Sequence, residues 1–115
     1  MEGRWQGRWS SDANGHNGKL LCFVSRQEDG DYAARFKATY KRVLKFSYTV
    51  PITVEHTNGV WHFHGEENLG KLAGGIYQYD GTATPTHFHS TYHSKYDHGV
   101  FEMERPSDNT RKQTD

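Results

Sequence analysis

The sequence predicts an all-β protein, a single domain in which eight strands form an antiparallel up-and-down barrel. Apolar and polar residues alternate along most of the chain, and aromatic residues make up 14% of it although only 33% is hydrophobic. Asx-Gly pairs recur between the alternating segments. Alternation is typical of half-buried strands, aromatic residues favour strands, and Asx-Gly between two strands is the strongest short-range hairpin signal.

The alternation defines the strands in order. Between residues 32 and 40, for example, Tyr32, Phe36 and Tyr40 fall on one face, whereas Arg35 and Lys37 fall on the other. Residues that alternate in this way point to opposite faces of a sheet. The expected strands span residues about 4–10, 18–27, 31–41, 44–56, 59–65, 73–80, 84–93 and 98–105.

Turns are expected where glycine follows a small or polar residue, at Asn14-Gly15, Asn17-Gly18, Asp29-Gly30, Asn58-Gly59, Gly74-Gly75, Asp80-Gly81 and His98-Gly99. Residues 66–71 could also form one short helical turn. Eight consecutive strands joined by short turns form a meander, and closing it into a barrel removes two exposed edges. The barrel domain is expected to span residues 1–106. The polar tail, residues 107–115, is expected to be disordered.

The chain also matches itself in part when it is shifted by 52 positions. Seven of 32 aligned residues are identical, including Trp9 with Trp61 and Phe36 with Phe88. About two identities are expected from ordinary residue frequencies. The match suggests two pseudo-symmetric four-stranded halves. The alternative is chance similarity between strands of like composition.

Two short motifs resemble the calycin superfamily, which includes lipocalins, fatty-acid-binding proteins and avidins. Residues 3–9 place a Gly-x-Trp on the first expected strand, and residues 97–105 resemble a calycin's last strand, which ends in arginine. The resemblance implies that Trp5 or Trp9 lies at the barrel floor with Arg105 across its face in a cation–π contact. The sequence as a whole resembles a small bacterial barrel of this broad type, and this resemblance implies no particular activity.

The interior is expected to be rich in tyrosine and tryptophan. An eight-stranded barrel can hold one small ligand or fill itself with side chains, and a buried Tyr hydroxyl needs a hydrogen-bonding partner. We therefore expect non-catalytic binding of a flat or amphipathic hydrophobic ligand. The expected ligand-binding residues are Trp9, Tyr32, Phe36, Tyr40, Tyr48, Trp61, Tyr77, Tyr79, Phe88 and Tyr92.

Two other classes of function remain open. The barrel could be plugged by its own aromatic side chains and serve as a structural or oligomeric interaction module. It could also be an isomerase-type or cyclase-type enzyme that works by the shape of its pocket. The single cysteine, Cys22, is expected to be a small buried hydrophobe, and no residue pattern indicates a catalytic group. Catalysis is therefore the less favoured class.

The eight histidines do not form a metal-binding pattern. His62 and His64 share a strand face, as do His87, His89 and His93, and these faces point outward about 9.5 Å apart. We expect no cofactor. Two alternatives remain open. The first is a divalent metal ion at His93 and His98, which flank the last hairpin, with Asp97 as a further candidate ligand. The second is haem on an inward or rim histidine, for which His56, His93 and His98 are the candidates.

The charges predict few macromolecular partners. The 14 basic and 14 acidic residues balance, which argues against nucleic acid and anionic membranes. The basic residues that cluster along the third strand are expected to form a solvated face: Arg35, Lys37, Lys41, Arg42 and Lys45. Exposed Leu21, Phe23 and Ile76 could form the seam of a homo-oligomer. Residues 1–10 lack the apolar core of a signal peptide, so a cytoplasmic location is expected if the chain is complete.

Overall fold

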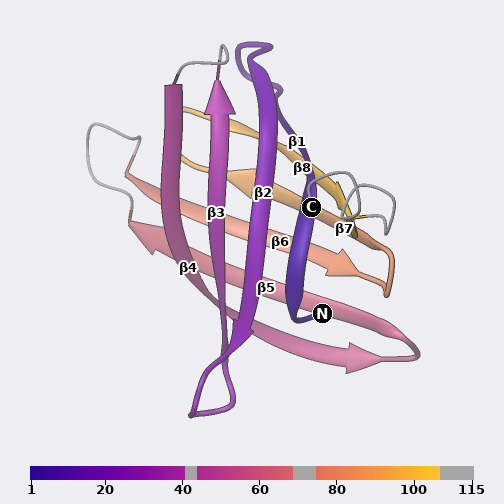
Figure 1. Ribbon diagram of the computed structural model, residues 1–115. Coiled ribbons are helices and arrows are strands. Elements are labelled where there is room, and N and C mark those ends of the chain that lie inside the picture. Colours follow the sequence, from indigo (N-terminus) through magenta and orange to yellow (C-terminus); the bar gives the residue numbers. More distant parts are fainter. Residues whose placement is uncertain (41–43, 69–74, 107–115) are drawn as a thin grey trace.

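The protein is a closed eight-stranded antiparallel barrel, as the alternation predicts. The computed structural model describes residues 1–40, 44–68 and 75–106. Each strand pairs with the next along the chain, and β1 pairs with β8 to close the barrel (Figure 1). No helix in these residues is long and apolar enough to cross a membrane. The strands are β1 (Gly3–Ser11), β2 (Asn17–Arg26), β3 (Tyr32–Tyr40), β4 (Leu44–Thr57), β5 (Val60–Asn68), β6 (Ile76–Ala83), β7 (His87–His93) and β8 (His98–Glu104).

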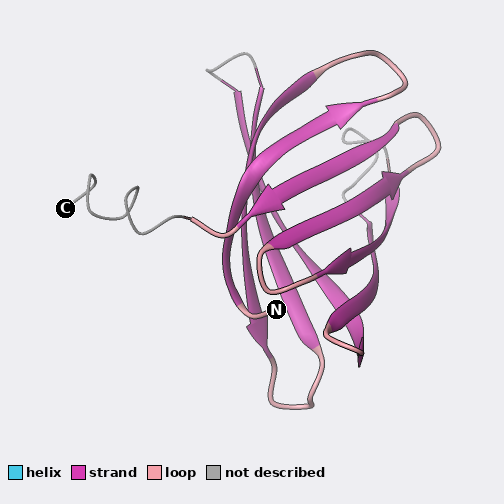
Figure 2. Cartoon of the chain, turned by 90° about the vertical axis from the view of Figure 1, so that its right-hand side faces the viewer, coloured by secondary structure: helices cyan, strands magenta, loops and turns pink. Residues whose placement is uncertain are grey.

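The barrel is flattened, with extents of 35 × 35 × 24 Å. In Figure 1, β2, β3 and β4 stand side by side, and β5 to β8 cross them at a steep angle. Figure 2 shows the same barrel from the side, with hairpin loops at both of its ends. One end carries the turns that follow β1 and β7, and the other carries the turns that follow β2, β4 and β6.

The second of these ends is filled by side chains. Trp5 packs against Phe88 with ring centroids 5.5 Å apart, and Phe88 packs against Phe63 at 4.9 Å. The Arg105 guanidinium lies 3.9 Å from the Trp5 ring centroid and donates hydrogen bonds to the Glu2 and Arg4 carbonyls. Trp5, rather than Trp9, therefore occupies the floor position that the resemblance implies. We call this the plugged end.

Three of the expected turns are wrong. Asn17-Gly18, Asp80-Gly81 and His98-Gly99 lie within strands. A Cβ added at Gly81 would lie 2.5 Å from the Phe63 ring and 2.2 Å from the His89 carbonyl oxygen. Glycine is required at this position because the neighbouring strand comes too close for any side chain. The final two turns lie instead between β6 and β7 and between β7 and β8.

The Asn58-Gly59 turn is confirmed, with φ values of 52° and 80° at its two residues. Such values on two adjacent residues are typical of the tightest hairpins. The strand limits shift elsewhere: β6 continues to Ala83, three residues beyond its expected end, and β5 continues to Asn68. The helical turn is therefore wrong for residues 66–68. Residues 69–71, Gly74 and the tail at 107–115 lie outside the described residues.

The two tryptophans that the internal match aligns do not occupy equivalent places. Trp9 lies near the end of β1 and pairs with Gly18 and Phe101, whereas Trp61 lies near the start of β5 and pairs with His56 and Ala83. Both strands begin at the plugged end, so the two rings lie at opposite ends of the barrel. Trp9 and Trp61 are therefore not related by a twofold rotation about the barrel axis.

Candidate functional site

A cavity of about 610 Å³ opens at the end of the barrel opposite the plug. Its walls come from β1, β3, β4, β6, β7 and β8 and from the turns after β1 and β7. The residues that line it are Trp9, His16, Ala38, Tyr40, Lys45, Phe46, Ser47, Tyr48, Tyr77, Tyr79, Tyr92, Asp97 and Phe101. We call this the tyrosine cavity. It is the candidate site because it lies in the open end of the barrel and combines aromatic surface with a few polar groups.

The cavity brings together six of the ten residues expected to bind a ligand: Trp9, Tyr40, Tyr48, Tyr77, Tyr79 and Tyr92. The other four lie outside it. Tyr32 begins β3 and Trp61 lies near the start of β5, so both are at the plugged end. Phe88 is part of the plug. Phe36 is buried one layer below the cavity.

Stacked rings form the base of the cavity. Phe36 stacks on Tyr48 and Tyr79, with ring centroids 5.5 and 5.9 Å apart, and contacts Phe101 at 5.2 Å. Phe101 also stacks on Tyr92 at 5.0 Å. Rings at these separations hold one another in place. The cavity therefore has a preformed aromatic base.

Burial further favours the neutral form of three phenols of this cavity. It is the main cause that raises the pKa of Tyr48, Tyr79 and Tyr92 well above the usual value for tyrosine. Tyr48 and Tyr79 share a hydrogen bond between their hydroxyls. A neutral phenol can both donate and accept a hydrogen bond. The cavity thus offers orienting groups on an aromatic surface.

Trp9 and His16 form one wall near the mouth. The Trp9 indole donates a hydrogen bond to the Thr39 carbonyl at 3.1 Å, which fixes the ring across β2 and β3. Gly18 leaves room for it, since a Cβ there would lie 2.8 Å from the indole nitrogen. Tyr40 contacts both rings, Trp9 at 6.0 Å and His16 at 4.8 Å.

A carboxylate lies at the mouth between two turns. Asp97, in the turn after β7, accepts a 2.5 Å hydrogen bond from the hydroxyl of buried Ser11. The Tyr92 hydroxyl lies beside the same serine, and the negative charge of Asp97 adds to burial in raising the pKa of Tyr92. The mouth is therefore negatively charged on the side of β7 and β8.

Sequence reasoning missed four residues that line the mouth: His16, Lys45, Phe46 and Asp97. They come from loops and strand ends that are far apart in the sequence and meet only when β1 pairs with β8. Counting the turns that share one end of a barrel could have drawn attention to His16 and Asp97. Phe46 belongs to the residues of β4 that point into the barrel, but its side chain lies exposed at the rim.

A larger hollow, about 1130 Å³, lies on the outer wall over β1 to β4, β7 and β8. Charged side chains such as Arg8, Lys19, Lys37 and Glu102 line it. These charged residues belong to the alternate positions that point away from the barrel interior, so the hollow is a concave part of the outer surface. Its lining is mostly charged and aliphatic, with Phe46 as the aromatic residue among the described ones, which is unlike the aromatic lining of a typical small-molecule site.

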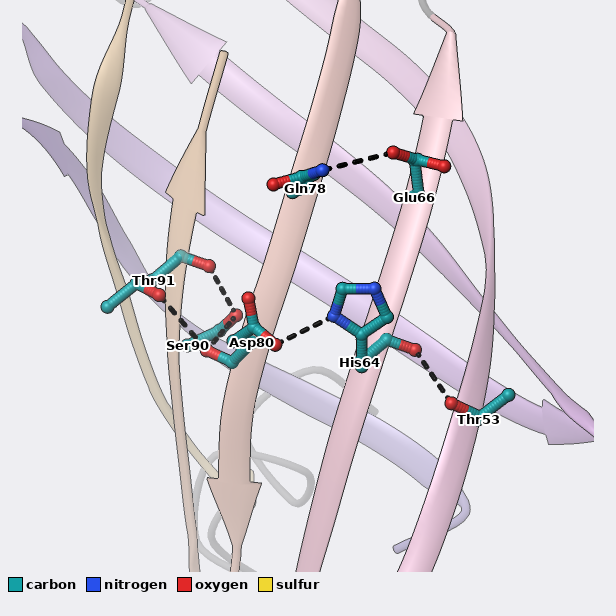
Figure 3. A network of polar contacts seen from close by, with 7 residues as sticks. All are labelled: Thr53, His64, Glu66, Gln78, Asp80, Ser90 and Thr91. Atoms are coloured by element: carbon teal, nitrogen blue, oxygen red, sulfur yellow. Dashed lines mark hydrogen bonds and ion pairs between the residues drawn. The ribbon is translucent and has the colours of Figure 1, made fainter.

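Three histidines of β5 and β7, namely His64, His87 and His89, face outward and lie within 4 Å of carboxylates on neighbouring strands. His64 contacts Asp80 at 2.7 Å, and His89 contacts Glu102. Figure 3 shows the first pair within a wider polar network on β4 to β7, where Gln78 donates to Glu66 at 3.1 Å. All four paired side chains are largely exposed. Such pairs fix strand register and contribute little to stability.

The candidate metal and haem histidines lie apart from the cavity lining. The rings of His93 and His98 are 6.5 Å apart, and the nearest carboxylate oxygen to His98 is that of Asp12, at 3.9 Å. Among the residues that the structure describes, no three His, Cys, Asp or Glu side chains come together as metal ligands. His56 stacks on Trp61 at 4.3 Å, at the plugged end.

The remaining candidates lie on the outside or in the core. Cys22 is buried, and burial raises the pKa of its thiol, which is unfavourable for a nucleophile. Arg35, Lys37 and Lys45 are exposed, whereas Lys41 and Arg42 lie outside the described residues. The apolar side chains suggested for a seam, Leu21, Phe23 and Ile76, are 47%, 51% and 54% exposed.

Comparison of the chain with protein-family models, with curated proteins and with solved structures gives no significant match.

Proposed function

We propose that the protein binds a small, flat or amphipathic hydrophobic molecule in the tyrosine cavity and does not transform it. The observation that carries this proposal is the cavity of about 610 Å³ at one end of a barrel whose other end is plugged. Ligand sites in proteins typically occupy about 300–1,000 Å³. A barrel that serves only as a structural module would gain stability by filling this space as well.

The lining supports the same class of ligand. Five tyrosines and Trp9 offer flat apolar faces, and the neutral phenols offer hydrogen bonds at fixed places. The other four expected residues contribute to binding only by shaping the barrel below the cavity and at the plugged end: Tyr32, Phe36, Trp61 and Phe88. The Trp5–Arg105 contact is of the kind that the calycin resemblance implies, so we include a calycin-like relationship in the proposal.

Native mass spectrometry of protein purified without a metal-affinity step tests the proposal. We expect extra mass on the folded protein that is lost on denaturation, because an aromatic cavity of this size retains apolar molecules from the cell. If the protein carries no extra mass, a titration with naphthylmethanol, a neutral aromatic alcohol, follows. An apo mass together with no binding at millimolar naphthylmethanol would contradict the proposal and favour the interaction module.

A further inference from the structure

Asp97 is the acidic side chain among the described residues that line the tyrosine cavity. It is half-buried, in the turn between β7 and β8, close to Tyr92, and it lines the cavity together with Phe101. A carboxylate here costs desolvation, which a protein normally offsets with a cation or with hydrogen bonds. The contacts of Asp97 therefore indicate what the cavity is built to receive.

Two buried serines hold this carboxylate in place. The Ser11 hydroxyl donates to Asp97 Oδ1 and itself accepts from the amides of Ala13 and Asn14 at 3.2 and 3.4 Å. The Ser94 hydroxyl accepts from the Asp97 amide at 3.1 Å, and the Ser94 amide donates to the Asp97 carbonyl at 2.7 Å. The turn is thus tied to β1 before any ligand enters. A group fixed in this way loses little entropy on binding.

The carboxylate has no cationic partner within the described part of the chain. Each ion pair found there joins a histidine to Asp12, Asp80, Glu102 or Glu104. The hydrogen bond from Ser11 reaches only Oδ1, which leaves Oδ2 without a hydrogen-bond donor among these residues. Asp97 therefore brings to the mouth a carboxylate that one hydroxyl stabilises and that forms no ion pair among the described residues.

The neighbouring rings also favour positive charge. Tyr92 stacks on Phe101 at 5.0 Å and contacts Tyr77 at 6.2 Å. The faces of such rings carry partial negative charge and attract ammonium groups within about 6 Å. Asp12 lies outside the cavity lining and pairs with His98, but its charge also acts on Tyr92. Aromatic rings beside a carboxylate are the combination that recognises organic cations.

We propose that the ligand of the tyrosine cavity is a small organic cation, with its flat body among the tyrosines and its ammonium group against Asp97. This inference rests on the proposed function and specifies its ligand. Lys45 and His16 also line the cavity, and Lys45 lies on β4, across the barrel from β8. They define the competing outcome, in which the ligand is an anion.

Three probes with one ring system separate these outcomes: naphthylmethylammonium, naphthylmethanol and naphthoate, titrated by calorimetry at neutral pH. We expect the cation to bind about tenfold more tightly than the alcohol, a difference of about 1.4 kcal/mol, and the anion to bind most weakly. Equal binding of cation and alcohol, or tightest binding of naphthoate, overturns the proposed cation. Failure of all three probes at millimolar concentration instead contradicts the proposed function itself.

The Asp97→Asn variant tests the role of the carboxylate. The amide oxygen can still accept from Ser11, so the turn is preserved, and the near-ultraviolet circular dichroism of the variant checks this. We expect the variant to bind the cation about tenfold more weakly than the unmodified protein does. Its affinity for the alcohol should change less than threefold, so that the two probes then bind about equally. Glu55→Gln removes one carboxylate from the outer surface and serves as the matched control, with no expected effect. If the Asp97→Asn variant still prefers the cation, Asp97 is not the group that binds the ammonium. If the variant does not fold, the ranking of the three probes on the unmodified protein tests the proposed cation.

Discussion

Tyr92 joins the aromatic base of the cavity to its charged mouth. Its ring stacks on Phe101, and its hydroxyl lies beside Ser11 and 3.5 Å from the Ser10 carbonyl. Its ring also fills the space above Gly99, where a Cβ would lie 2.7 Å from the hydroxyl oxygen. The ring is therefore fixed by packing, and the residue lines the cavity where the aromatic base meets the mouth.

Replacing Tyr92 by Phe is expected to weaken binding of naphthylmethanol about three- to tenfold, because one hydrogen bond of about 1 kcal/mol is lost. The ring remains, so the free energy of unfolding should change by less than about 1 kcal/mol. Calorimetry and urea unfolding measure the two effects. Tyr32→Phe, at the plugged end, is the matched control and should leave the affinity unchanged. Equal loss of affinity in both variants would show that the Tyr92 hydroxyl has no specific part in binding.

The buried phenols also predict how stability depends on pH. The pKa values of Tyr48, Tyr79 and Tyr92 are raised in the folded protein, so the unfolded chain releases these protons first, near the ordinary value of 10. Their contribution is therefore complete below pH 10 and is lost as the pH rises above it. Each group should cost about 1.4 kcal/mol per pH unit in that range. Urea unfolding at several alkaline pH values measures this loss, and a stability that does not fall above pH 10 would contradict the burial of these groups.

Glycine that follows Asn or Asp has two distinct roles in this barrel, and they look alike in the sequence. Asn58-Gly59 forms a tight turn with positive φ at both residues. Asp80-Gly81 lies in the middle of β6, where Gly81 faces inward beneath the Phe63 ring. The sequence motif is the same, but the second glycine serves close strand approach in a strongly curved sheet. Because the pattern of Asp80-Gly81 predicts a turn, the predicted end of β6 is three residues too early.

Gly81→Ala is expected to destabilise the barrel by at least about 1–3 kcal/mol, because the added methyl group overlaps the Phe63 ring and the backbone of β7. Urea unfolding measures the change. Thr49→Ala, on the exposed face of β4, is the control for an alanine introduced in a strand and should cost less than about 1 kcal/mol. A Gly81 variant as stable as this control would show that β6 and β7 can separate at no cost.

Across the whole molecule, the barrel divides into a plugged half and an open half. Arg105, just after β8, covers Trp5 on β1 and binds the carbonyls of Glu2 and Arg4. These contacts join the two ends of the barrel domain where the first and last strands meet. The cavity lies at the far end, so closure and binding depend on different residues.

Arg105→Ala is therefore expected to lower the free energy of unfolding by about 2–3 kcal/mol, through loss of the cation–π contact and two hydrogen bonds. The affinity of the folded variant for naphthylmethanol should change less than threefold. Arg35→Ala, on the exposed outer wall, is the control for loss of an arginine. If Arg105→Ala weakens binding as strongly as Tyr92→Phe does, the two halves are coupled.

The sequence predicts the architecture well because every strand has one buried face, and burial of alternate residues leaves a clear pattern. Tyr48, Tyr77, Tyr79 and Tyr92 could be assigned to the interior for the same reason. Asp97 could not be assigned to the ligand site, because its partner Ser11 lies at the end of β1 and reaches it only when β1 pairs with β8. The division into a plugged and an open half likewise depends on which side chains meet across the barrel.

The contacts of Arg105 with Glu2 and of Trp5 with the Met1 carbonyl place the start of the chain at the plugged end. A linker attached to Met1 therefore points away from the cavity mouth. Immobilised on a solid support through this residue, each molecule would present its mouth to the solution. The barrel thus suits a surface-bound sensor in which small molecules reach the tyrosines directly from the bulk liquid.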